Sequence, residues 1–250
     1  MSQQLDGVLQ LDATEQELVH EQFEVDTADH EDHTFCGVMF TIECHTELPA
    51  EYLEVQSVWV RGALGPMTCW VTRKDVEDVM EKPSEWTRVY EAEHSASPVA
   101  LTELKLVESI RLLRGERCGL YVHSGLQGDE GLVYDNQRGD VTYHDKVLKV
   151  LPGLAHISNR PFGTRGMWWG SAWRSNRAFV GRLAYGVRWR RWSPAPEVHH
   201  AFPRGFRETV ITLLAGSRRP ESLLYLLQDE VIFFLMNKVC ISSEDEEPHS

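Results

Sequence analysis

Two pairs of histidine and serine are the residues of this chain best suited to nucleophilic catalysis. His123 directly precedes Ser124, and His156 lies two positions before Ser158. An imidazole beside a hydroxyl can act as the base that activates it, and a third group such as Asp135 would orient the imidazole. Neither serine lies in a G-x-S-x-G elbow, the turn that exposes the nucleophile in many hydrolases. We therefore expect polar groups at strand ends and no catalytic residue, with a hydrolase using a cleft at one end of the fold as the alternative.

Histidine and acidic side chains also raise the question of a metal site. Cupin barrels bind metal through two tight histidine-containing signatures on paired strands, and this chain has neither. The run from His30 to His33 has a helix-compatible spacing but lies in an acidic segment. We expect no metal and no cofactor, and a metal-dependent enzyme remains part of the alternative. Its ligands would come from His123, His144, His156 and Glu130.

A segment rich in tryptophan and arginine is the strongest candidate for a binding site. Three tryptophans occur within six residues, in a connection from Gly163 to Arg177. Trp and Arg dominate binding hot spots, and arginine stacks on indole rings. The competing interpretation is structural: the rings close the open end of the fold. We expect indoles to supply apolar contact and guanidinium groups to pair with carboxylate or phosphate. The predicted binding residues are Arg165, Trp168, Trp169, Trp173, Arg174 and Arg177.

Six arginines follow closely in the sequence and form a basic stripe. Such a stripe could bind a phosphate or an acidic peptide. It could equally hold the acidic N-terminal part of the same chain in an autoinhibitory contact, which salt would weaken if the contact is exposed. The six are Arg174, Arg177, Arg182, Arg188, Arg190 and Arg191.

The elements that must position these residues are short strands. From Phe179 to Trp189 apolar and polar residues alternate, which is typical of a strand with one buried face and one wet face. Similar strand-like runs separated by Gly, Pro and Asp begin at Phe35. Their number and spacing predict a mainly β fold, an antiparallel sandwich of the jelly-roll kind.

Composition limits the classes of function. The chain has 250 residues and a net charge of −13, but residues 1–33 carry ten acids and no base, and the C-terminal tail is acidic as well. The body is close to neutral, so we expect no nucleic-acid binding. The five cysteines form no C-x-x-C pair. The first residues lack the pattern of a signal peptide, so we expect a cytoplasmic or nuclear protein.

After Trp192 the pattern changes to helical spacing. A helical pair is expected, the second helix running from about Pro220 to Val239. This apolar segment contains Gln228, Asp229 and Glu230 in its middle, and carboxylates at mid-bilayer each cost roughly 2.5–3.5 kcal/mol. We therefore expect a packed helix and no membrane span.

Two resemblances bear on function. The region from Phe35 to Trp192 looks like the sandwich modules of the galactose-binding-like and PHR type, on the strength of Gly37–Ile42, Leu101–Leu104 and Gly119–Val122. PHR modules mediate protein interactions in ubiquitin-ligase and BTB proteins. This resemblance implies a protein-binding sandwich.

The second resemblance lies in the C-terminal segment from Pro220 to Leu235. It is similar to the opening of an F-box, with Gln228 where a proline is usual. The resemblance implies docking on a cullin-ligase subunit, while a plain packing helix explains the same pattern. The docking residues would be Leu224, Leu227, Val231 and Leu235.

Taken together, the sequence predicts an interaction module that is not an enzyme and that recognises a protein or a small ligand. Replacement of Trp169 by alanine should abolish binding and leave folding cooperative. The expected organisation is an acidic disordered arm (1–33), a β-sandwich (34–192), a helical extension (193–240) and an acidic tail (241–250).

Overall fold

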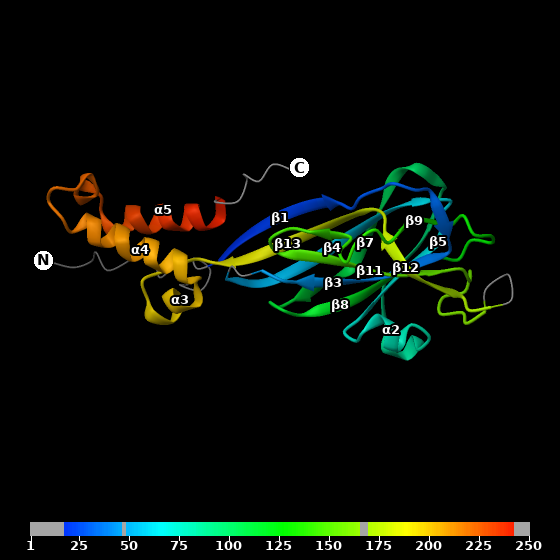
Figure 1. Ribbon diagram of the computed structural model, residues 1–250. Coiled ribbons are helices and arrows are strands. Elements are labelled where there is room, and N and C mark those ends of the chain that lie inside the picture. The colour runs from blue at the N-terminus through cyan, green and yellow to red at the C-terminus, as the bar shows by residue number, and fades with distance from the viewer. Residues whose placement is uncertain (1–17, 47–48, 166–169, 243–250) are drawn as a thin grey trace, which may run out of the picture. The chain divides into compact units, whose positions relative to one another are not determined.

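The fold is the predicted one, mainly β, with antiparallel sheets in a sandwich and short helices after them (Figure 1). The computed structural model describes residues 18–46, 49–165 and 170–242, apart from the side chains of 18–19 and 239–242. The chain divides into two compact units. One comprises residues 20–46 and 50–188, and the other contains the helices that follow Trp189.

The smaller sheet of the sandwich has four strands in the order β1-β13-β4-β7. Along β4 the buried side chains are Leu53, Val55 and Ser57, then Val58 and Val60, so the alternation changes phase between Ser57 and Val58. The pairing with β7 is irregular just before this point, between Val55 and Ser57. The strands are β1 (Leu18–Asp26), β4 (Ala50–Gly62), β7 (Ser97–Leu112) and β13 (Arg182–Arg190).

The larger sheet has nine strands in the order β2-β9-β12-β11-β3-β8-β5-β6, with β10 paired to β11. Its strands are β2 (His33–Phe35), β3 (Gly37–Cys44), β5 (Gly65–Thr72), β6 (Thr87–His94), β8 (Arg117–Ser124), β9 (Leu132–Asn136), β10 (Tyr143–His144), β11 (Leu148–His156) and β12 (Trp173–Phe179).

The central strands of the larger sheet are covered on both faces. β8 is buried from Cys118 to Ser124 without alternation, as expected of a strand with no wet face. The inner face packs into the sandwich core, where Phe40 and Phe179 stack with ring centroids 4.3 Å apart. The outer face carries a second apolar cluster, covered by α2 (Val76–Val79), the turn η1 (Pro83–Glu85) and the segment around Phe162.

The predicted disordered arm is wrong for residues 18–33. Residues 18–26 form β1, beside β13, and His33 begins β2. The physical reason is visible in the strand: Phe23 stacks on Tyr185 with ring centroids 5.2 Å apart, while Gln22 and Glu24 are exposed. Residues 1–17 of the predicted arm lie outside the described residues.

The helical unit contains α3 (Pro196–Ala201), α4 (Arg204–Ser217), η2 (Leu223–Leu226) and α5 (Asp229–Ser242). The single helix expected from Pro220 to Val239 is therefore wrong. Ser222 caps a short turn that ends at Leu227, where the backbone is extended, and α5 starts only at Asp229. None of the helices that the structure describes is long and apolar enough to cross a membrane. Most of the predicted tail, from residue 243, is outside the described part.

Candidate functional site

One row of side chains crosses five strands on the outer face of the larger sheet. Strand register places Thr68 opposite His123, His123 opposite Gly37, Gly37 opposite His156, and His156 opposite Trp173. Gly37 lets the flanking rings pack over the middle of the row, because a Cβ there would lie 2.9 Å from the Tyr121 ring and 3.1 Å from that of His123. The row thus brings together both candidate histidines and one candidate tryptophan.

The two imidazoles bind residues 157–163, the covering segment of this face, to the sheet. His123 Nε2 donates to the carbonyl oxygen of Ser158 at 2.9 Å, and His156 Nε2 donates to that of Gly163 at 2.8 Å. Since the proton of His156 is on Nε2, its Nδ1 accepts from the Tyr121 hydroxyl at 2.6 Å. The contacts hold residues 157–163 against the strands below.

Burial keeps both imidazoles neutral. Desolvation lowers the pKa of His123 to about 3, against the bond to Ser158 and with a smaller contribution from His156. It lowers the pKa of His156 to about 4, opposed by the bond to Gly163. Neither ring would take up a second proton near pH 7, so both act as neutral structural links.

The paired serines do not face these imidazoles. Ser124 Oγ donates to the carbonyl of Leu64 and accepts from the amide of Leu126 at 3.1 Å, while Ser158 Oγ accepts from the amide of Arg160 at 3.2 Å. His123 and Ser124 are neighbours on one strand, so they point to opposite faces of the sheet. The structure therefore places each serine in a backbone turn and not beside a base.

Asp135 has a structural partner of a different kind. Its two carboxylate oxygens accept from the backbone amides of His30 and Glu31, each at 2.7 Å. The side chain is buried at the end of β9 and anchors the link between β1 and β2. It does not orient either imidazole by a hydrogen bond, so the proposed triad is not assembled.

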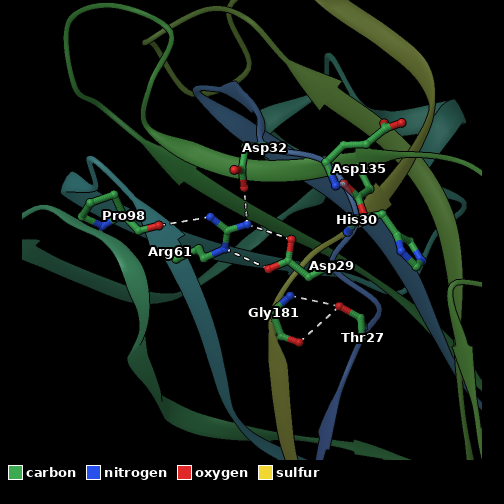
Figure 2. Close-up of polar contacts among 9 residues, drawn as sticks. Thr27, Asp29, His30, Asp32, Arg61, Pro98, Asp135 and Gly181 are labelled. Carbon is green, nitrogen blue, oxygen red and sulfur yellow. Dashed lines mark hydrogen bonds and ion pairs between the residues drawn. The ribbon is translucent and has the colours of Figure 1, made fainter.

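The acidic link between β1 and β2 is held by basic groups (Figure 2). Arg61 pairs with Asp29 at 2.7 Å and with Asp32 at 2.6 Å, and it also donates to the carbonyl of Pro98 at 3.0 Å. Arg138 pairs with Glu31 at 3.0 Å. Thr27, which is buried, exchanges hydrogen bonds with the backbone of Gly181. This part of the acidic region is docked on the sandwich.

The basic stripe contributes to this docking through Arg182. Arg182 pairs with Glu24 at 3.0 Å and with Asp26 at 2.6 Å, and the bond to Arg182 lowers the pKa of Asp26. Arg61 and Arg138, which the sequence analysis did not single out, make the other contacts. Nothing in the local sequence marks these two arginines, because their acidic partners are distant in the chain and are brought near only by the pairing of the strands.

The candidate metal ligands are not gathered into one site. Among the residues that the structure describes, no three His, Cys, Asp or Glu side chains are placed to hold a metal ion. His144 and Glu130 are exposed, on β10 and in a turn. In the acidic run, His33 pairs with Glu31 at 3.1 Å.

Trp173 is a core residue, as the structural interpretation of this segment expects, and its role in binding stays a prediction. It is 6% exposed, belongs to the outer apolar cluster, and stacks on His156 with ring centroids 4.0 Å apart and planes at 20°. Trp173 is the first residue of β12, and its indole lies on the outer face of the sheet, under residues 157–163. Trp168 and Trp169 lie outside the described residues, so their predicted role stays a prediction.

The three predicted arginines of the connection from Gly163 to Arg177 lie at or near the protein surface. Arg165 forms an isolated bridge with Ser171 and is exposed, as is Arg174. Nη1 of Arg174 donates to the carbonyls of Ser171 and Trp173, both at 2.9 Å. Arg177 is half-buried over the ring of Tyr134, 5.8 Å from its centroid.

These arginines share one electrostatic property with Arg160, a residue that the sequence analysis missed. Residues 160–177 contain four arginines and no acid. Within the described part of the chain none of the four forms an ion pair, in contrast to Arg61 and Arg182. We call the group Arg160, Arg165, Arg174 and Arg177 the arginine loop.

The four predicted docking residues of the C-terminal segment, three leucines and one valine, fall into two groups. Leu224 and Leu227 are half-buried, and Leu227 packs against the small core of the helical unit. Val231 and Leu235 are exposed on α5. Among the described side chains of α5, Ile232 and Met236 are the buried ones.

No protein-family model matches the chain, and no curated protein matches it as a relative. The conclusions on function therefore rest on the site itself.

Proposed function

We propose that this chain is a binding module that recognises an anionic segment of a protein partner through the arginine loop. The observation that carries the proposal is the set of four arginines in residues 160–177 with no acid among them and no ion pair within the described residues. Elsewhere on the sandwich Arg73, Arg88 and Arg117 each form an ion pair with a glutamate. Unpaired guanidinium groups are suited to bidentate binding of carboxylate or phosphate.

The support beneath the loop favours a pre-organised site. His123 and His156 bond to the backbone of the covering segment, and Trp173 packs under its C-terminal end. A binding group mounted on a rigid base loses less conformational entropy when it binds. Arg165 and Arg174 would then meet the anionic groups, and Trp168 and Trp169 would supply the apolar contact that the sequence predicts.

A protein partner fits the charge distribution better than a nucleic acid does. The chain as a whole carries −13, which would repel a long polyanion, whereas a short acidic or phosphorylated peptide needs only the local positive charge. The hydrolase alternative has weaker support, because the serine hydroxyls bond to backbone atoms and the imidazoles are buried.

The proposal predicts that charge removal at the loop weakens binding. With a fluorescein-labelled glutamate-rich peptide and its phosphoserine counterpart as probes, we expect Arg165→Ala combined with Arg174→Ala to raise the Kd by roughly 100-fold, about tenfold for each lost charged hydrogen bond. Both side chains are exposed, so the midpoint of urea unfolding should change little. Fluorescence anisotropy would measure the affinity.

Arg114→Ala is the matched control, because Arg114 is also exposed and lies in the turn between β7 and β8. This variant should bind both peptides as the unaltered chain does. Equal losses at Arg114 and at the arginine loop would mean that the peptides respond only to overall charge, and the proposed site would be wrong. A preference for the phosphoserine peptide over the glutamate peptide would identify the anion as phosphate.

A further inference from the structure

Helix α5 has one buried and one exposed apolar face. Ile232 and Met236 are buried in the core of the helical unit. On the other side Val231 is 40%, Phe234 61% and Leu235 45% exposed. Large apolar side chains grouped in this way mark an interaction surface more often than isolated exposed ones do.

The exposed face has oppositely charged ends. At 100° per residue, Glu230 and Lys238 lie on the same side of α5 as Val231, Phe234 and Leu235. Glu230 is exposed in the first turn, and Lys238 lies eight residues further on, about 12 Å along the axis. The face therefore runs from negative, through apolar, to positive.

We propose that α5 pairs with α5 of a second copy of this chain in an antiparallel, two-fold symmetric dimer. Antiparallel pairing centred on Phe234 sets Glu230 of each chain beside Lys238 of the other and buries Val231, Phe234 and Leu235 between them. It also sets the two helix dipoles in favourable opposition. Parallel pairing would oppose Glu230 to Glu230 and Lys238 to Lys238. A face that is complementary to itself under a two-fold rotation is the requirement for a closed dimer.

The helical unit has a small apolar core and exposes apolar side chains that a partner would cover. Its core holds five buried side chains, Trp192, Phe202, Val210, Ile232 and Met236. In the same unit Leu223 and Leu226 are 88% and 82% exposed, so large apolar side chains remain in water beside this small core. Small helical scaffolds are commonly stabilised by association. This inference does not depend on the proposed function of the arginine loop.

Sedimentation velocity on the full chain tests the dimer. The chain should sediment as a dimer at micromolar concentration, and Phe234→Glu combined with Leu235→Glu should raise the dissociation constant at least about 100-fold. Val99→Glu is the matched control, because Val99 is 88% exposed on β7 of the sandwich, and this variant should remain dimeric. A chain that is monomeric at 100 µM or so overturns the proposal.

A charge exchange tests the antiparallel register. Glu230→Lys alone and Lys238→Glu alone should each weaken the dimer by about tenfold, since two-fold symmetry breaks two pairs at once. The double variant should restore it. The two positions are too far apart along one helix to pair within a chain, so rescue requires contact between copies. Failure of the double variant to recover overturns the register. A monomeric chain that binds a purified cullin-ligase subunit through Leu235 would favour the F-box-like role over the dimer.

Discussion

Replacing Trp173 with alanine should lower the free energy of unfolding by about 3–5 kcal/mol, the usual loss when a buried tryptophan is removed. The indole stacks on His156, lies in the outer apolar cluster, and is 6% exposed. Its loss would leave a cavity beneath residues 157–163 and loosen the base of the arginine loop. Urea denaturation followed by circular dichroism would measure the change in stability.

Trp169→Ala provides the comparison within the same segment. The sequence predicts that this variant loses binding and still unfolds cooperatively. The pair thus separates a core ring from a recognition ring. Unchanged stability of Trp173→Ala would mean that the indole is not packed as described, and strong destabilisation of Trp169→Ala would assign that ring to the core.

Acidification should destabilise the sandwich through the two buried imidazoles. In the unfolded chain histidine has a pKa of about 6.5, whereas burial lowers the pKa of His123 to about 3 and that of His156 to about 4. Between these values the unfolded state binds more protons, so stability falls as the pH falls below 6.5. Each histidine should contribute a slope of up to about 1.4 kcal/mol per pH unit down to its folded pKa. Denaturation at a series of pH values from 7 to 4.5 would measure it.

Variants at single histidines isolate this effect from that of the carboxylates. His156→Gln should lose stability at pH 7, because Tyr121 and Gly163 lose their partner, but its stability should depend less on pH. His144→Gln, at an exposed position, should keep the slope of the unaltered chain. A slope that is the same in His156→Gln and His144→Gln would contradict the neutral, buried state assigned to His156.

Much of the fold could be predicted from local sequence because a half-buried strand leaves a period of two. The strand-like run at Gly37–Ile42 corresponds to β3. The alternation from Phe179 to Trp189 predicts one strand, but the structure ends β12 at Phe179 and begins β13 at Arg182, in the other sheet, so only its second part is β13. β1 was missed because its ten-acid surroundings suggested disorder, although Phe23 and Val25 alternate with Gln22 and Glu24 within it. There, burial against Tyr185 and ion pairing outweigh composition.

The site was less accessible to prediction because its contacts depend on strand register. The row from Thr68 to Trp173 joins five strands, and nothing in the local sequence places His123 two strands from His156. Arg61 meets Asp29 across 32 residues for the same reason. Trp173 and Arg174 are adjacent, and adjacent residues of a strand point to opposite faces of the sheet. The sequence could therefore have predicted that only one of the two is exposed.

The central claim is that the arginine loop binds an anionic peptide, and the charge selectivity of the full chain tests it most directly. Anisotropy titrations would compare a glutamate-rich peptide with a lysine-rich peptide of equal length, each at low and physiological salt. We expect saturable binding of the glutamate-rich peptide, weakened by salt, and no binding of the lysine-rich peptide despite the net charge of −13. Preferential binding of the lysine-rich peptide would show that the acidic surface governs recognition and would contradict the account.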